Sequence, residues 1–293
     1  MKIDVVVVTY ESARELASCL TALPGEASVW VVDNASRDGS AKLARGLGAL
    51  VVRNQRNLGF AAAANQGARL GHGDLVLFLN PDATIPEPDL RRLVAVLEGD
   101  PRLLAVGPCL RHPDGTEQRA WWPFPSAAAT WAEALGLRRL RPSRAGADGL
   151  VPFVVGACLL VRRRHFETLG GFDERFWLYG EEADLCYRAR RRGWRVRHVA
   201  DATARHVGGA SGHAIGRLAF EHFQRGTEHF ILKHHGWRAL VAHRLGLLTG
   251  SLLRLPLLAA GRRPDAAARV TTRRAVTARL TGVLLRHPTR VAP

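Results

Sequence analysis

Residues 75–82 read LVLFLNPD, five apolar residues followed by a turn that carries a carboxylate. Two earlier apolar runs end in a similar way, at Thr9-Tyr10 and at Asp33-Asn34. A buried strand that presents polar side chains at its carboxyl end is how an open α/β sheet builds a ligand site. The repeated pattern therefore predicts a ligand site at one rim of a parallel sheet.

Strand-like and helical segments alternate along the first third of the chain. We expect strands at 2–8, 28–33, 49–53, 74–79 and 103–110, and helices near 12–22, 36–46, 59–70 and 88–98. Strands that alternate with helices indicate an α/β fold with a mostly parallel sheet and helices on its faces.

The middle of the chain is less regular. Residues 138–149 are rich in Arg, Gly, Ala and Pro, and we expect them to form a mobile loop. Regular structure is expected to resume with the apolar run at 151–161, a helix at 181–192 and a short strand at 195–199.

The composition limits the partners and the compartment. The 293 residues carry a net charge of +16, and such a surface attracts nucleic acids, anionic lipid headgroups or diphosphates without choosing between them. The four cysteines form no CxxC pair, which favours reduced thiols over a disulfide framework or a zinc site. The N-terminus lacks the regions of a signal peptide, so we expect a cytoplasmic protein.

Beyond residue 213 the sequence is helical, apolar and basic. Residues 216–235 have the pattern of an amphipathic helix, whereas 237–260 are strongly apolar but interrupted by charges and a proline. A spanning helix needs about 20 predominantly apolar residues, so we expect this run to lie in the membrane interface. Residues 261–293 hold eight arginines and one aspartate. We therefore predict an α/β domain at 1–212 and an extension at 213–293 that binds an anionic membrane surface.

Two carboxylates follow predicted strands. Asp33 could accept a hydrogen bond from a base or a sugar, or it could cap the next helix. Asp82 would lie beside the phosphate end of a ligand, where a hard divalent cation could neutralise a diphosphate. An ordinary Asn-Pro-Asp turn is the structural alternative for Asp82.

An acidic cluster opens the helix expected at 181–192. Glu181, Glu182 and Asp184 complement the dipole of that helix, which alone could explain them. Three acids near Trp177 and Tyr179 exceed this need, because like charges and desolvation raise one carboxyl pKa towards that of a working base. We therefore predict a functional acid in this cluster.

Two further features leave alternatives open. Asn57 and Gly59 precede a helix of small residues, and the glycine could permit close approach of a nucleotide or form a simple turn. His206 follows the expected last strand, although a lone histidine is more often structural than a ligand. The chain has no GxGxxG fingerprint and no P-loop, so redox and NTPase functions lack their marker.

Taken together, the motifs resemble those of the family 2 glycosyltransferases, which have the GT-A fold. In chain order they are VVTYES, VVDNAS, NLGFAAAANQG, LNPDA, GACLLVRR and GGFDERFWLYGEEADLCYR, and they span about residues 3–210. The last block is the most specific. Within the family the chain is most similar to the bacterial rhamnosyltransferases that build cell-wall polysaccharide on lipid carriers.

The resemblance implies a role for each motif. The donor nucleotide would be bound by Thr9, Tyr10, Glu11, Asp33, Asn57, Gly59 and Asn80. A divalent metal, Mg²⁺ or Mn²⁺, would be held by Asp82 and His206. Glu182 would be the catalytic base, and the acceptor pocket would be lined by Trp177, Tyr179, Glu181 and Asp184.

The implied reaction is inverting transfer of a sugar, expected to be rhamnose from dTDP-rhamnose, to a polyprenyl-diphosphate-linked glycan. The enzyme would act in cell-envelope synthesis as a peripheral protein on the inner face of the membrane. Another donor sugar, nucleotidyl transfer and nucleic-acid binding are the alternatives. The first loop lacks the Gly-rich basic sequence of a nucleotidyltransferase. The arginines are not interleaved with aromatic residues, so we expect no nucleic-acid partner.

Overall fold

The computed structural model describes residues 2–137, 148–208 and 216–259, with the backbone alone at 216–220 and 254–259. Most of the loop expected at 138–149 and all of 261–293 lie outside these residues. The chain divides into two compact units, one of Met1–Phe124 with Arg144–Gly226 and one of Pro125–Ser143 with Thr227–Ala292. The domain boundary that we expected at residue 212 stays a prediction.

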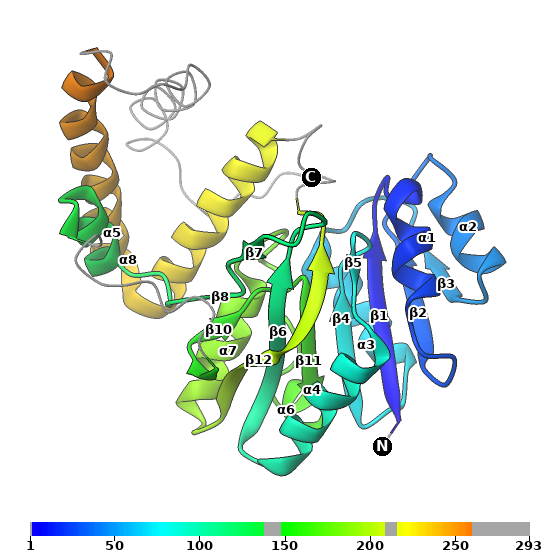
Figure 1. Ribbon diagram of the computed structural model, residues 1–293. Coiled ribbons are helices and arrows are strands. Elements are labelled where there is room, and N and C mark those ends of the chain that lie inside the picture. The colour runs from blue at the N-terminus through cyan, green and yellow to red at the C-terminus, as the bar shows by residue number, and fades with distance from the viewer. Residues whose placement is uncertain (1, 138–147, 209–215, 260–293) are drawn as a thin grey trace. The chain divides into compact units, whose positions relative to one another are not determined.

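A central sheet organises the first unit (Figure 1). In spatial order its strands are β3 (Leu50–Arg53), β2 (Ser28–Asp33), β1 (Ile3–Thr9), β4 (Leu75–Leu79), β11 (Cys158–Arg162), β6 (Leu103–Arg111), β12 (Arg195–His206) and β5 (Ala83–Thr84). Two short strands attach to it, β7 (Glu117–Gln118) beside β6 and β9 (Gly149–Val151) beside β12. A separate pair is formed by β8 (Trp121–Trp122) and β10 (Phe153–Val154).

The sheet is mostly parallel, as the sequence predicts. β1 runs parallel to β2 and β4, β2 parallel to β3, and β6 parallel to β12. β11 is antiparallel to both of its neighbours, β4 and β6. The carboxyl ends of the parallel strands therefore lie along one rim, the upper one in Figure 1.

The last long strand differs from the expectation. We predicted a short strand at 195–199, but β12 continues to His206, with a register shift between Val199 and Thr203. Alanine and aspartate at 200–202 have low strand propensity, which hid this continuation. Pairing with β6 and with β5 overrides that propensity and places His206 opposite Ala83.

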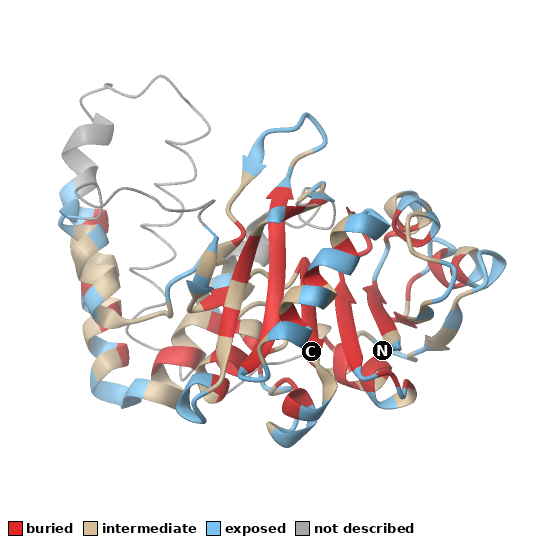
Figure 2. Ribbon diagram, turned by 60° about the horizontal axis from the view of Figure 1, so that its bottom comes forward, coloured by how far each residue is buried: buried red, intermediate tan, exposed pale blue. Residues whose placement is uncertain are grey.

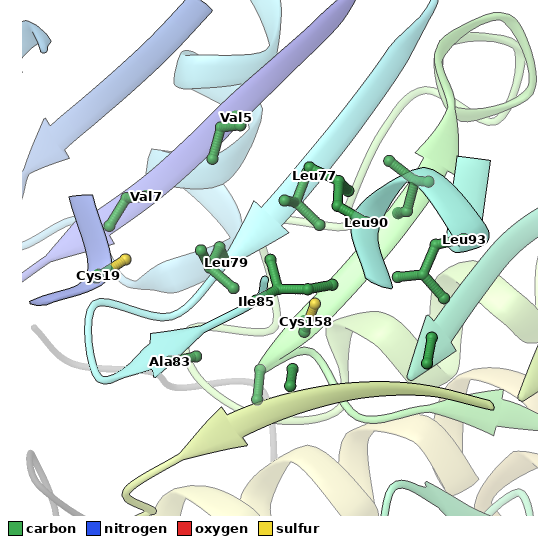
Figure 3. Close-up of a cluster of buried hydrophobic side chains, with 14 of the residues drawn as sticks. Val5, Val7, Cys19, Leu77, Leu79, Ala83, Ile85, Leu90, Leu93 and Cys158 are labelled. Atoms are coloured by element: carbon green, nitrogen blue, oxygen red, sulfur yellow. The ribbon is translucent and has the colours of Figure 1, made fainter. Parts of the chain in front are cut away.

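Helices cover both faces of the sheet. One face carries α1 (Ala13–Thr21), α2 (Ser40–Gly46) and α4 (Glu87–Gly99), and the other carries α3 (Phe60–Leu70), α6 (Arg163–Thr168) and α7 (Glu181–Arg191). Side chains alternate along each strand, so Val5 and Val7 pack with α1 and α4 (Figure 3) whereas Val6 packs against Gly67 of α3. The strands are largely buried and the helices turn exposed sides outward (Figure 2).

The described part of the second unit is mainly helical. α5 (Ala127–Ala134) packs against the later part of α8 (Gly216–Ala259), where Trp131 Nε1 donates to the carbonyl of Ala242 at 2.9 Å. α8 is broken at Gly236, whose φ is 80°, and this is where the sequence predicts a change of character. Among the described residues, no helix is both long enough and apolar enough to span a bilayer.

Candidate active site

The ends of β1 and β2 form the first part of the site. Thr9 is paired with Asp33, and both are fully buried. Oδ1 of Asp33 accepts a hydrogen bond from the N–H of Ser36 at 3.2 Å, while Oδ2 lies 3.2 Å from Nε of Arg53. The Thr9 hydroxyl is buried without a hydrogen bond in the part of the chain that is described. Such an atom favours a polar ligand, because an unbonded buried oxygen costs free energy.

Glu11 is turned towards the neighbouring loop. Its Oε1 accepts from the N–H of Arg37 at 2.9 Å, and its own N–H donates to Ser36 Oγ at 3.0 Å. Glu11 thus ties the loop after β1 to the loop after β2, while the preceding Tyr10 is 41% exposed. Of the two, Tyr10 has the side chain that is free to meet a base, and the donor-binding role of both stays a prediction.

The close approach at Gly59 is to another part of the protein. A Cβ on this glycine would lie 2.5 Å from the carbonyl oxygen of Trp177, which accepts a hydrogen bond from the N–H of Phe60 at 2.7 Å. Asn57 supports the turn, since its Oδ1 accepts from the N–H of Gly59 at 2.9 Å. The glycine therefore lets the start of α3 lie against the segment that precedes α7.

The turn after β4 meets the end of β12. Nε2 of His206 lies 3.4 Å from Oδ1 of Asp82 and 3.4 Å from Nδ2 of Asn80. Pairing of β5 with β12 produces this meeting, and the N–H of Val207 donates to the carbonyl of Asp82 at 3.0 Å. Burial alone would raise the pKa of Asp82, but with His206 in its protonated form the hydrogen bond from that ring and its charge outweigh burial and lower the pKa.

Glu182 lies at the same rim as Asp82. The two are linked through the segment before β11, because the N–H of Asn80 donates to the carbonyl of Ala157 at 3.0 Å. A Cβ on the adjoining Gly156 would lie 4.0 Å from the Glu182 carboxyl group, and the N–H of Gly180 donates to Glu182 Oε2 at 3.2 Å. Asp82 and Glu182 are thus connected through Asn80 and the two residues before β11.

Glu181 and Glu182 have different environments. Burial, followed by the charge of Glu182, raises the pKa of Glu181 well above its ordinary value, and Glu181 Oε2 is buried without a hydrogen bond. Burial also raises the pKa of Glu182, but hydrogen bonds from backbone N–H groups offset part of the effect. Glu181 therefore holds its proton more firmly, and Glu182 is the member of the pair that can act as a base near neutral pH.

The residues before α7 pack against the first turns of α8. Trp177 stacks on His222 with ring centroids 4.5 Å apart, and Tyr179 meets Phe223 edge-on at 6.3 Å. Burial and then the charges of Glu181, Glu182 and Asp82 raise the pKa of Tyr179, so its phenol faces both acidic parts of the site. Sequence reasoning missed His222 and Phe223, because nothing in their local pattern distinguishes them from other helix residues.

Asp184 is not brought into the site. Its fully buried side chain pairs with Nε of Arg188 at 2.7 Å, and the same guanidinium group donates to the carbonyls of Leu169 and Gly171. This carboxylate fixes the turn that leads into the loop before α7. Its nearness to Glu182 in the sequence suggested a pocket role for Asp184. The two residues are two positions apart on the helix, however, and their side chains do not share a face.

Strained backbone gathers at this rim. Three described residues other than glycine have positive φ, namely Glu11 at 51°, Ala35 at 70° and Tyr179 at 69°. They follow β1, follow β2 and precede α7. Such conformations cost of order 1–3 kcal/mol each and cluster at functional sites, which supports assigning the function to this rim.

A comparison with protein families decides the class. The model of glycosyl transferase family 2 matches residues 4–170 of the 293, more than half of the chain. The chain belongs to the family 2 glycosyltransferases. A second model, described as the N-terminal domain of galactosyltransferase, matches 150–207 of this glycosyltransferase, the part that contains Glu182 and His206. Nucleotidyl transfer and nucleic-acid binding thereby lose their basis as primary functions.

Characterised relatives include rhamnosyltransferases. This glycosyltransferase is 31% identical over 270 residues to N-acetylglucosaminyl-diphospho-decaprenol L-rhamnosyltransferase of Mycobacterium tuberculosis, covering 80% of this chain and 86% of the relative. It is 25% identical over 165 residues to rhamnosyltransferase WbbL of Escherichia coli, covering 55% of this chain and 62% of the relative.

Solved structures confirm the expected fold. A mannosyltransferase from Pyrobaculum calidifontis, solved in complex with GDP-Man and Mn²⁺, is similar with a TM-score of 0.61. The two chains share 20% sequence identity, and the match covers 95% of this chain and 84% of the other. The glycosyltransferase thus has the GT-A fold that its motifs predict.

Proposed function

We propose that this glycosyltransferase transfers rhamnose from dTDP-rhamnose to a polyprenyl-diphosphate-linked sugar, with inversion at the anomeric carbon. The rhamnosyltransferases among its relatives support the donor, and the activity for which the mycobacterial relative is named supports the acceptor. The observation that carries the mechanism is the placement of Glu182 and Asp82 at one rim, connected through Asn80 and Ala157.

Glu182 performs the proton transfer. As the acceptor hydroxyl attacks the anomeric carbon, the O–H proton passes to the Glu182 carboxylate and the bond from the sugar to the nucleoside diphosphate breaks. The raised pKa of Glu181 favours its protonated form, which leaves Glu182 as the carboxyl group that takes the proton. Tyr179, whose pKa is also raised, keeps its proton and can donate a hydrogen bond within the pocket.

The donor set fits a divalent metal. Asp82 offers the carboxylate oxygen Oδ1, and His206 offers Nε2 at 3.4 Å from it. No cluster of three His, Cys, Asp or Glu side chains suited to a metal occurs within the described ranges. Two protein ligands agree with Mg²⁺-type sites, in which substrate phosphates complete the coordination. When bound, the metal supplies positive charge for the departing diphosphate.

A membrane-facing location follows from the acceptor. A polyprenyl diphosphate is anchored in the bilayer, so the enzyme must work at the membrane surface. We propose that it works at the cytoplasmic face, held there by the C-terminal region. An exposed apolar stripe on α8 supports this location, formed by Trp237, Val241, Leu245 and Leu252. Their spacing of four, four and seven residues puts them on one helix face.

The substitution Glu182→Gln tests the mechanism. Gln keeps the size of the side chain but cannot take a proton, so we expect turnover to fall about 10²–10⁴-fold. Binding of dTDP, measured by calorimetry, should stay unchanged, because the nucleotide end of the site is separate from the base.

The matched control is Glu98→Gln, which alters an exposed carboxylate on α4 and should leave both quantities unchanged. Turnover of the Glu182→Gln enzyme equal to that of the wild type would remove Glu182 as the base. A panel of nucleotide sugars, assayed with a polyprenyl-diphosphate-GlcNAc acceptor, tests the donor independently.

A further inference from the structure

Gln118 lies behind His206, on the side away from Asp82. It belongs to β7, which is joined to β6 by a turn closed by a hydrogen bond from the N–H of His112 to the carbonyl of Thr116 at 2.8 Å. Gln118 Oε1 lies 2.9 Å from Nδ1 of His206, and Gln118 Nε2 lies 2.5 Å from the carbonyl oxygen of the same residue. The amide therefore contacts both the ring and the backbone of His206.

The orientation of this amide is determined by the backbone. A carbonyl oxygen can only accept a hydrogen bond, so the group of Gln118 that faces the His206 carbonyl must be the NH₂ group. Its second N–H has an acceptor in Nδ1 of His112 at 2.7 Å. Exchanging the oxygen and nitrogen would put two acceptors together at 2.5 Å, which excludes the flipped amide.

The orientation of Gln118 in turn determines the tautomer of His206. With Oε1 facing the ring, Nδ1 of His206 must carry a proton and donate it. A neutral imidazole has one N–H, so Nε2 is then unprotonated and directs its lone pair towards Asp82 and Asn80. The Nδ2 group of Asn80, a donor at 3.4 Å from Nε2, agrees with this assignment, whereas Oδ1 of Asp82 is an acceptor at the same distance, so these two atoms need a cation between them.

We propose that Gln118 is a positioning residue that holds His206 in the Nδ1–H tautomer, so that Nε2 is available as a ligand for a divalent metal beside Asp82. The inference rests on the proposed function only for the metal. The tautomer itself follows from hydrogen bonds within the protein. Partners of this kind change metal affinity by about 10–100-fold when they are removed.

The tautomer can be measured in the metal-free full-length protein. Long-range ¹H–¹⁵N correlation spectra of histidine-labelled enzyme distinguish the two tautomers, and His206→Gln assigns the relevant signals. In the pH range where these signals no longer shift, we expect wild-type His206 to be protonated at Nδ1. Gln118→Leu removes the acceptor and should populate the Nε2–H form.

Metal affinity gives the second readout, with Mn²⁺ titrated into protein saturated with dTDP. We expect Gln118→Leu to weaken Mn²⁺ binding about 10–100-fold. The control is Glu117→Gln, an exposed neighbour on the same strand, which should change neither readout.

The outcomes separate the two proposals. A Gln118→Leu protein that keeps the Nδ1–H tautomer, or that changes tautomer without losing Mn²⁺ affinity, overturns the role of Gln118. If the tautomer shifts as expected but the wild type itself binds no Mn²⁺ with dTDP, the positioning by Gln118 stands and the metal role of His206 and Asp82 fails. A loss of Mn²⁺ affinity in Gln118→Leu with an unchanged tautomer would show a structural effect only and would also overturn the inference.

Discussion

The neighbouring carboxyl groups of Glu181 and Glu182 differ in how strongly their surroundings favour the charged form. Glu182 receives hydrogen bonds from backbone N–H groups, which favour its charged form, whereas Glu181 Oε2 receives none among the described residues. The sequence predicts an acidic cluster with a base, but it cannot assign the proton. That assignment depends on which carboxyl group meets Gly180 and Gly156 in space.

A stability measurement tests the protonated state of Glu181. Its pKa is raised above 4.5 in the folded protein, so the folded state binds more protons than the unfolded state at higher pH. The free energy of unfolding must then fall as the pH rises from about 4.5 through the folded-state pKa. The fall is about 1.4 kcal/mol for each pH unit that separates the folded-state pKa from the unfolded-state pKa. Glu181→Gln removes this contribution.

The midpoint of thermal unfolding, followed by circular dichroism from pH 5 to pH 8, should therefore decline less with pH in Glu181→Gln than in the wild type. The variant should be the more stable protein at the upper end of this range. Glu98→Gln, which changes an exposed carboxylate, should follow the wild type. Parallel curves for Glu181→Gln and the wild type would show that the Glu181 carboxyl group is ionised in the folded state.

At the level of elements, the long apolar strands could be predicted and the short ones could not. β1 and β4 are buried on both faces, as is the carboxyl half of β2, and all three appear in the sequence as apolar runs, so their carboxyl ends predict the site. β5 and β7 have two residues each, too few for any periodicity. Yet β5 brings Asp82 to His206 and β7 supplies Gln118, so the proposed metal site of Asp82 and His206 depends on elements without a sequence signal.

The first turns of α8 form another element that the site requires. A Cβ on Gly226 would lie 2.1 Å from the carbonyl oxygen of Tyr179, so this glycine lets the helix pack directly on the loop before α7. We expect Gly226→Ala to force the two apart, with a loss of about 1–3 kcal/mol in the free energy of unfolding. Turnover should also fall, because Tyr179 and Gly180 position Glu182.

The control for this substitution is Gly46→Ala in α2, where an added Cβ has open space. There the change should be neutral or stabilising by up to about 1 kcal/mol, since alanine favours a helix more than glycine does. Denaturant unfolding measures the change in the free energy of unfolding of both variants, and steady-state kinetics measures their turnover. A Gly226→Ala enzyme as stable and as active as the Gly46→Ala enzyme would mean that α8 does not constrain the loop.

At the level of the whole molecule, the proposed binding to a membrane combines two contributions, the net positive charge and the exposed apolar surface. The net charge of +16 attracts anionic surfaces at long range but cannot by itself select a membrane. The apolar stripe of α8 adds a short-range attraction that nucleic acid would not satisfy. Sequence patterning indicated an interfacial segment at 237–260. It could not show which side chains are exposed, because α5 covers part of α8 through Thr130 and Trp131.

Vesicle binding tests this combination. The double substitution Trp237→Ser with Leu245→Ser removes two side chains that are 65% and 49% exposed. Inserting a large apolar side chain into a bilayer interface contributes of order 1 kcal/mol or more, so we expect the partition coefficient for phosphatidylglycerol vesicles to fall roughly tenfold or more. Leu47→Ser, at a 42% exposed position in the first unit, should have no effect.

The electrostatic part should separate from the apolar part in the same sedimentation assay. Deleting 261–293, which removes eight arginines and one aspartate, should weaken binding at low salt and leave little difference at high salt, where surface charges are screened. The double substitution should weaken binding at both salt concentrations, because burial of apolar surface is not screened. Binding that survives both changes unaltered would place the membrane contact elsewhere on the protein.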